Sequence, residues 1–163
     1  MLRALAVAGG VAGAAVLSQF PEFSQQYLQR LAGQVDAMAL LVAEFDATAA
    51  ANGLTRDAAL AELRGTPFLI DRRTDLERAF ARHDRLAANL AALRAASPLE
   101  RMAMPHRLAD PETLRATWAD FRPAVPVTAD GGISALVGYF AGWLGASAVL
   151  GLLAAPFRRR RTA

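Results

Sequence analysis

The residues best suited to chemistry gather in one short stretch, Met102-Ala-Met104-Pro-His106. Two thioethers and one imidazole are soft ligands of the kind that select Cu(I). Methionine is equally a common packing residue, however, and three ligands within five positions make a weak metal motif. We therefore expect packing roles for these side chains and predict no metal site and no cofactor.

No familiar catalytic motif occurs in the 163 residues: G-x-S-x-G, H-E-x-x-H, a phosphate loop and a dinucleotide fingerprint are all missing from the sequence. The chain has no cysteine, which excludes thiolate nucleophiles and disulfides. His83 falls on an apolar helical stripe and is expected to pack there rather than act as a base. The sequence therefore predicts a protein that is not an enzyme.

The basic residues are unevenly placed. All 18 are arginine, and five lie near the ends, namely Arg3, Arg158, Arg159, Arg160 and Arg161. The segment from Glu22 to Asp130 holds the other 13 arginines and all 15 acidic residues, so its net charge is −2. A basic cluster directly after an apolar run indicates membrane topology rather than nucleic-acid binding. We expect no nucleic-acid partner.

The first uncharged run is Ala4 to Pro21, 18 residues long. A helix of that length reaches about 27 Å, just enough for a hydrocarbon core. A cleaved signal peptide is the rival interpretation, with Arg3 before an apolar core, but the best cleavage pattern, Val16-Leu17-Ser18, is poor. The sequence favours an N-terminal transmembrane helix over residues 1–21.

The second uncharged run, Gly131 to Phe157, has 27 residues and many bulky apolar side chains, which predicts a transmembrane helix over residues 131–157. The arginine-rich tail, 158–163, is expected to stay in the cytoplasm, because positively charged residues are retained on that side of the membrane. Arg3 predicts the same location for the N-terminus. This arrangement predicts a bacterial inner-membrane protein with both termini cytoplasmic and residues 22–130 in the periplasm.

Both runs carry glycines at helical spacing, which let helix backbones approach closely in lipid. The first forms one G-x-x-x-G pair and the second forms another with a further glycine one register over: Gly9, Gly13, Gly138, Gly142 and Gly145. Chance in an Ala/Gly-rich sequence is the alternative explanation. We predict that the two spans pack on each other or on a partner.

The middle region has two apolar stripes with alternating spacings of three and four, the heptad pattern of paired helices. The first stripe comprises Leu28, Leu31, Val35, Met38, Val42 and Phe45. The second includes Leu76, His83, Leu86, Leu90 and Leu93. The predicted fold is therefore all-α, with two transmembrane helices flanking a periplasmic antiparallel coiled-coil hairpin or bundle.

Turn and cap signals divide this region further. Asn52-Gly53 is expected to end the first long helix, Thr55 to cap a short helix that ends at Gly65, and Thr66-Pro67 to break the chain before a helix over 71–96. Ser97 to Glu100 fits a capping box, Asp110-Pro111-Glu112 opens another helix, and FRPAVPVTADGG is expected to be extended. Phe20, Phe23 and Tyr27 are expected near the membrane interface.

Two stretches are the least generic: LSQFPEFSQQYLQRLAGQVD after the first span and ATWADFRPAVPVT before the second. With them, the whole chain resembles an uncharacterised family of proteobacterial inner-membrane proteins, domain of unknown function 2937. The resemblance implies a membrane protein and supplies no activity, cofactor or catalytic residue.

These features favour a non-enzymatic interaction or accessory subunit, embedded in the lipid bilayer, that binds a membrane or envelope protein or associates with itself. A periplasmic sensor or carrier for a ligand or lipid is the alternative, and a metal-binding protein or enzyme is a third. An apolar cavity in the middle region would favour the sensor or carrier.

Overall fold

A computed structural model describes residues 2–124 and 127–159, and in this part of the chain every regular element is a helix. The elements are α1 (Leu2–Leu17), α2 (Phe20–Ala51), α3 (Arg56–Glu62), α4 (Pro67–Ala95), α5 (Pro98–Met102), the 3₁₀ helix η1 (Pro105–Arg107), α6 (Pro111–Asp120) and α7 (Ala129–Arg159). The predicted all-α fold is confirmed.

The chain forms two compact units. The first, called here the apolar unit, contains Met1–Gln26, Ser97–Pro105 and Trp118–Ala163, and the second, the hairpin unit, contains Tyr27–Ala96 and His106–Thr117. Residues 97–105 and 118–130 thus belong with the apolar helices, although in sequence they lie in the middle region.

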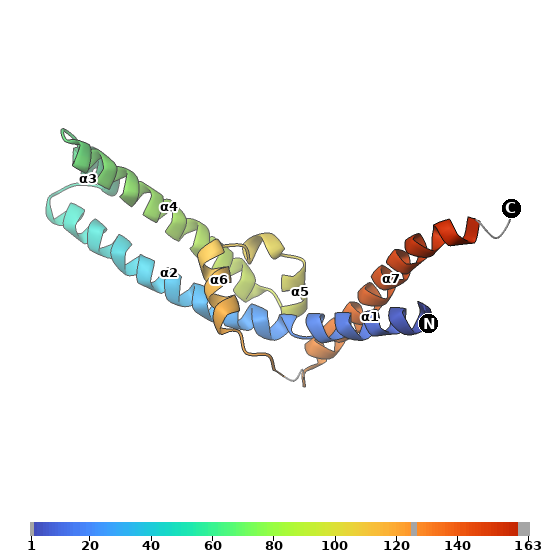
Figure 1. The fold of residues 1–163 in the computed structure, drawn as a ribbon. Helices are drawn as coiled ribbons and strands as arrows, with labels where there is room; N and C mark the ends of the chain where they lie inside the picture. The colour runs from blue at the N-terminus through green and yellow to red at the C-terminus, as the bar shows by residue number, and fades with distance from the viewer. Residues whose placement is uncertain (1, 125–126, 160–163) are drawn as a thin grey trace. The chain divides into compact units, whose positions relative to one another are not determined.

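In the hairpin unit, α2 and α4 run antiparallel and side by side, with α3 at the turn (Figure 1). Near the turn, the Phe45 and Phe80 rings meet edge to face with centroids 5.2 Å apart. Arg56 of α3 stacks 5.1 Å over the Phe80 ring and binds the Asp46 carboxylate through Nε at 2.7 Å. Leu60 and Leu76 complete this core. Cation–π and ion-pair contacts therefore hold α3 against both long helices.

Most of the predicted stripes face inward. On α2, Leu28, Leu31 and Val35 are buried, and Met38, Val42 and Phe45 are half-buried. On α4, Leu76, Leu86, Leu90 and Leu93 are buried, and His83 is half-buried with its Nδ1 3.0 Å from the carboxylate of Asp84. The stripe missed Phe80, which is 6% exposed. In a straight α-helix, residues spaced seven apart rotate gradually around the helix axis. The buried side chains of α4 therefore do not stay at strict heptad positions.

Local capping decides where the helices of the hairpin begin. Thr55 caps α3 as predicted, accepting a hydrogen bond from the backbone N–H of Ala58, but α3 ends at Glu62 rather than at Gly65. The predicted break at Thr66-Pro67 is confirmed, because residues 63–66 are not helical, but the predicted start of the next helix at Asp71 is wrong. Thr66 accepts from the backbone N–H of Leu69 and Pro67 occupies the first turn, so α4 starts four residues before Asp71.

The other cap signals are confirmed. Helix α2 ends at Ala51 and Gly53 takes a positive φ of 71°, a conformation that favours glycine. The capping box of Ser97 and Glu100 is complete, because each side chain accepts from the other residue's backbone N–H. Within the segment expected to be extended, α7 already begins at Ala129.

The Phe45–Phe80 contact makes a direct stability prediction. Phe80→Ala should lower the free energy of unfolding by about 3 kcal/mol, because it leaves a cavity in a packed core. Phe68→Ala, at a side chain that is 76% exposed, should change it by less than about 0.5 kcal/mol. Urea unfolding of the full chain in detergent, followed by circular dichroism, measures both; equal losses would contradict this core assignment.

Candidate functional site

The closest helix contact in the apolar unit joins α1 to α7. Gly9 lies against Gly142, and Gly13 lies against both Gly138 and Gly142. Because residue numbers rise along α1 as their partners fall along α7, the two helices pack antiparallel. The four glycines of the two G-x-x-x-G pairs therefore face one another across one contact.

Only hydrogen fits at these positions. A Cβ on Gly13 would lie closer than 3.0 Å to the carbonyl oxygen of Gly138, and a Cβ on Gly142 would do the same to Gly9. A Cβ on Gly9 would come within 2.6 Å of the Ala146 Cβ. The obstructing atoms are mostly backbone, which cannot swing aside, so the absence of side chains sets the distance between the helices.

Two further glycines differ from the prediction. Gly145 lies outside the contact, since a Cβ there would meet nothing within 4 Å. Gly145 follows Gly142 by three positions, which turns it about 60° away from Gly142 around the helix, and it lies about 100° from Ala146, which does face α1. Gly10, which the spacing did not single out, is buried beneath the ring of Tyr139. An adjacent large aromatic on the partner helix is the signal that could have identified it.

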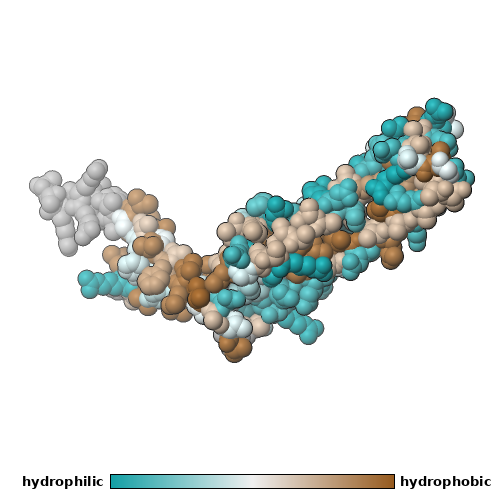
Figure 2. Space-filling model, turned by 180° about the vertical axis from the view of Figure 1, so that it is seen from behind, coloured by the Kyte–Doolittle hydropathy of each residue, from teal (hydrophilic) through white to brown (hydrophobic). Residues whose placement is uncertain are grey.

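The outer faces of both helices are apolar and uncovered. The exposed large side chains include Leu2, Leu5, Val7, Val11 and Val16 of α1, and Ile133, Leu136, Val137, Phe140, Trp143, Leu144, Val149, Leu152 and Leu153 of α7. Figure 2 shows hydrophobic side chains gathered over α1 and α7, whereas hydrophilic ones cover much of the outside of the hairpin. An apolar surface of this extent requires a cover other than water.

An aromatic cluster lies where α1 gives way to α2. The Phe23 ring is 6.0 Å from Trp118 and 5.6 Å from Phe121, and both contacts are edge to face. Trp118 remains 72% exposed. Tyr27, which is expected near the membrane interface together with Phe23, belongs to the hairpin unit. It is fully buried in the hairpin unit, where its hydroxyl accepts a hydrogen bond from the backbone N–H of Asp110 at 3.3 Å.

Glutamines of the first distinctive stretch bind the second. The Gln19 Oε1 accepts from the backbone N–H of Ala124 at 3.0 Å, and Gln26 Nε2 donates to the carbonyl of Arg122 at 3.3 Å. An extended, proline-containing segment has no helical partners for its backbone groups, so side-chain amides satisfy them. The sequence showed both stretches but not that they lie side by side.

The beginning of α1 and the later half of α7 line a common groove. Arg3 of α1 lines a groove with Leu150 and Gly151 of α7, so the beginning of α1 lies beside the later half of α7. The side chains of Arg158 and Arg159, and all of Arg160 and Arg161, lie outside the described residues.

The hairpin unit contains one buried polar network, centred on Asp110. Its Oδ2 accepts from the backbone N–H of Thr113 at 3.1 Å, from the Thr113 hydroxyl at 2.8 Å and from Arg82 at 3.2 Å. Arg82 also donates to Glu112 at 2.5 Å. The Thr113 hydroxyl, fully buried, binds Gln34 of α2. The network ties α6 to both long helices.

The ionisation of Asp110 follows from this environment. Burial acts to raise its pKa, but the hydrogen bonds from Thr113 and the charge of Arg82 outweigh burial and lower the pKa below the ordinary value. A carboxylate stabilised in this way contributes to folding above its unfolded pKa and loses that contribution as the pH falls through the folded value. This arrangement is structural, because every polar neighbour named here is already paired.

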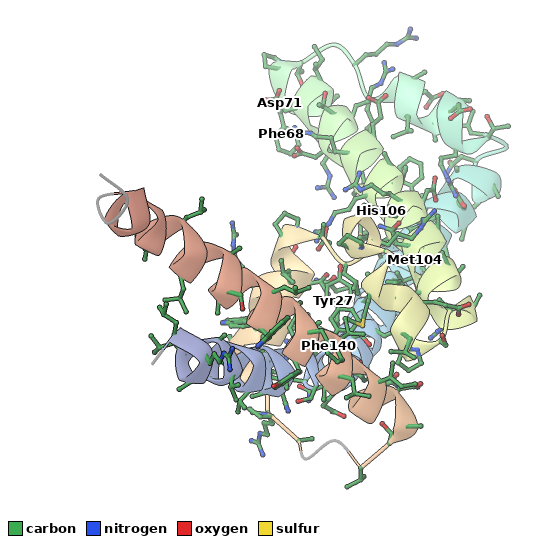
Figure 3. All side chains as sticks on the ribbon, turned by 90° about the vertical axis from the view of Figure 1, so that its right-hand side faces the viewer. Tyr27, Phe68, Asp71, Met104, His106 and Phe140 are labelled. Carbon is green, nitrogen blue, oxygen red and sulfur yellow. The ribbon has the colours of Figure 1, made fainter. Side chains whose placement is uncertain are left out.

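The Met-Met-His stretch is divided between the two units, with Met102 and Met104 in the apolar unit and His106 in the hairpin unit. The Met102 sulfur lies 3.8 Å from the Ser134 hydroxyl of α7, in the apolar unit. His106 is an exposed residue of η1, in the hairpin unit; Figure 3 labels it and Met104. Among the residues that the structure describes, no three His, Asp or Glu side chains form a group that could hold a metal ion.

The fold and these contacts define an all-helical protein with two segments, within Leu2–Ala51 and Ala129–Leu153, long and apolar enough to cross a membrane. The family model described as "Protein of unknown function (DUF2937)" matches residues 1–159, and the chain belongs to that family. The predicted membership of domain of unknown function 2937 is thereby confirmed. No curated protein and no solved structure matches the chain.

The glycine contact predicts a difference between two substitutions on one helix. Gly142→Ala should lower the stability of the α1–α7 pair by about 1–3 kcal/mol, because the added methyl forces the backbones apart. Gly145→Ala is the matched control: it adds the same methyl to α7 where nothing lies within 4 Å. Unfolding of both variants by sodium dodecyl sulfate measures the difference, and identical midpoints would contradict the proposed packing.

Proposed function

We propose that this chain is a non-enzymatic bacterial inner-membrane protein that acts as an interaction or accessory subunit. The observation that carries the proposal is the α1–α7 pair, in which backbones meet through Gly13, Gly138 and Gly142 while the outer faces expose large apolar side chains. Helices in lipid associate through close contacts between small residues, and their bulky residues face outward. Packing rather than hydrophobicity drives helix association there.

The same contact supports the proposed topology. Antiparallel helices return the chain to the side from which it started, so Arg3 and the arginines after Phe157 belong on one side of the bilayer. Arginine at both ends favours the cytoplasm for that side. The exposed Trp118 ring, beside Phe23, suits the opposite interface, where aromatic side chains sit well. The hairpin unit would then stand in the periplasm.

The hairpin unit would provide the surface for a partner. Its interior is occupied by its own side chains, so recognition must use the outside. At the start of α4, Phe68 is 76% exposed and Ile70 is 54% exposed; Figure 3 shows Phe68 and Asp71 at this tip. Leu40, in the middle of α2, is also 67% exposed. Uncovered apolar side chains at the tip of the hairpin favour contact with a membrane or envelope protein.

Packing in the hairpin weighs against a periplasmic sensor or carrier. Tyr27, Leu31, Leu86 and Leu93 are all less than 2% exposed, which leaves little space between the helices at the base of the hairpin. Two hollows of about 390 and 360 Å³ lie in the apolar unit and are lined by residues outside the hairpin unit. The interaction role therefore has the stronger support.

The topology is tested with reporter fusions. Alkaline phosphatase, which folds only in the periplasm, should be active when fused after Gly65 and inactive when fused after Ala163. A β-galactosidase series at the same two positions, active only in the cytoplasm, should give the reverse pattern. Phosphatase activity at Ala163 but not at Gly65 would overturn the topology.

The interaction role is tested by site-specific photo-crosslinking in the native membrane. A photoreactive amino acid in place of Phe68 should yield one reproducible adduct, identified by mass spectrometry after purification through a C-terminal tag. The same amino acid in place of Arg94, an exposed residue near the other end of α4, is the control and should give no such adduct. Equal labelling at both positions, or none at Phe68, would contradict a role for the tip.

A further inference from the structure

A groove opens between α1 and α7 beyond the glycine contact, in the apolar unit. It has a volume of about 390 Å³ and is lined by Leu2, Arg3, Ala6, Val7, Trp143, Ser147, Leu150 and Gly151. Its walls are almost wholly apolar, and its volume is within the range of small-molecule pockets. The groove lies between Gly9, which packs against Ala146 and Gly142, and the beginning of α1.

The groove has the dimensions of one leaflet. From Trp143 to Gly151 it follows eight residues of α7, which is about 12 Å along a helix. Half of a hydrocarbon core is about 15 Å. An extended acyl chain lying along the groove would therefore be covered over most of its depth in the membrane.

Arg3 brings a positive charge to the groove, and the one acidic residue of the two helices, Asp130, lies in the first turn of α7, far along the helix from Leu150 and Gly151. Arg3 lines the groove, and neither the first 21 residues nor residues 131–163 contain any Asp or Glu. The chain continues from α7 into four further arginines, Arg158 to Arg161. A guanidinium at a membrane surface pairs well with phosphate, so the missing counter-charge fits a phospholipid headgroup.

We propose that this groove binds one anionic phospholipid, with an acyl chain between α1 and α7 and its phosphate on Arg3. This inference rests on the proposed membrane insertion. It adds a specific ligand class and site, distinct from the glycine contact and from the hairpin tip.

The experiment uses the full chain, purified in mild detergent and titrated with phosphatidylglycerol or phosphatidylcholine under native mass spectrometry. Gly151→Leu should reduce phosphatidylglycerol binding at least tenfold, because the new side chain enters the groove. Gly145→Leu is the matched control, with the same substitution on the same helix at a position that does not line the groove, and should bind as the unsubstituted protein does.

A second pair of variants tests the charge. Arg3→Gln should remove most of the preference for phosphatidylglycerol over phosphatidylcholine, whereas Arg72→Gln, the same charge change on the exposed surface of the hairpin, should not. Undiminished binding by Gly151→Leu, or an unchanged preference in Arg3→Gln, would overturn the proposal. The proposal would also be overturned if the unsubstituted protein forms a dimer that Gly151→Leu loses while it still binds lipid. A second copy of the chain would then be the molecule that fills the groove.

Alkaline carbonate extraction of the membranes distinguishes a failure of the lipid-site proposal from a failure of the proposed membrane location. If the protein stays with the membrane but shows no preference between the lipids, the groove assignment alone is wrong. If the protein is extracted into the soluble fraction, the membrane location and the lipid site are both wrong.

Discussion

The contact between the backbones of α1 and α7 is the constraint on which the rest of the apolar unit depends. Gly13 and Gly142 bring carbonyl groups of one helix against Cα atoms of the other, a distance that any side chain would prevent. Once the helices meet in this way, their remaining apolar side chains can only face outward. The exposed surface is a consequence of the contact, and it makes lipid the natural surroundings of the pair.

The hairpin unit is held together by the opposite kind of packing. Here Phe45, Phe80 and a series of leucines keep the helices apart by the thickness of their side chains, and the surface between them is buried. The polar network of Asp110, Thr113 and Arg82 fixes α6 on this core, since each buried group has a partner. Small residues form the contact between α1 and α7, whereas large residues form the contact between α2 and α4. The first kind of packing suits helices in lipid, and the second suits helices in water.

The polar side chains described above take part in helix capping, in ion pairs or in the Asp110 network. In the part of the chain that the structure describes, the exposed surfaces of α1 and α7, the groove beside Arg3 and the tip at Phe68 are mainly apolar. Each of them needs another molecule to cover it.

The sequence by itself determined the helical class, the two apolar runs, the inward stripes and most caps, because these depend on periodicity and on neighbouring residues. It could not decide which glycines meet, since Gly145 and Gly142 belong to equally good patterns and only the rotation of α7 distinguishes them. Nor could it place Tyr27 beside Asp110, or Gln19 beside Ala124, because those partners are 83 and 105 residues apart in the chain. Such contacts depend on where the helices lie in space, which is the part that only the tertiary structure decides.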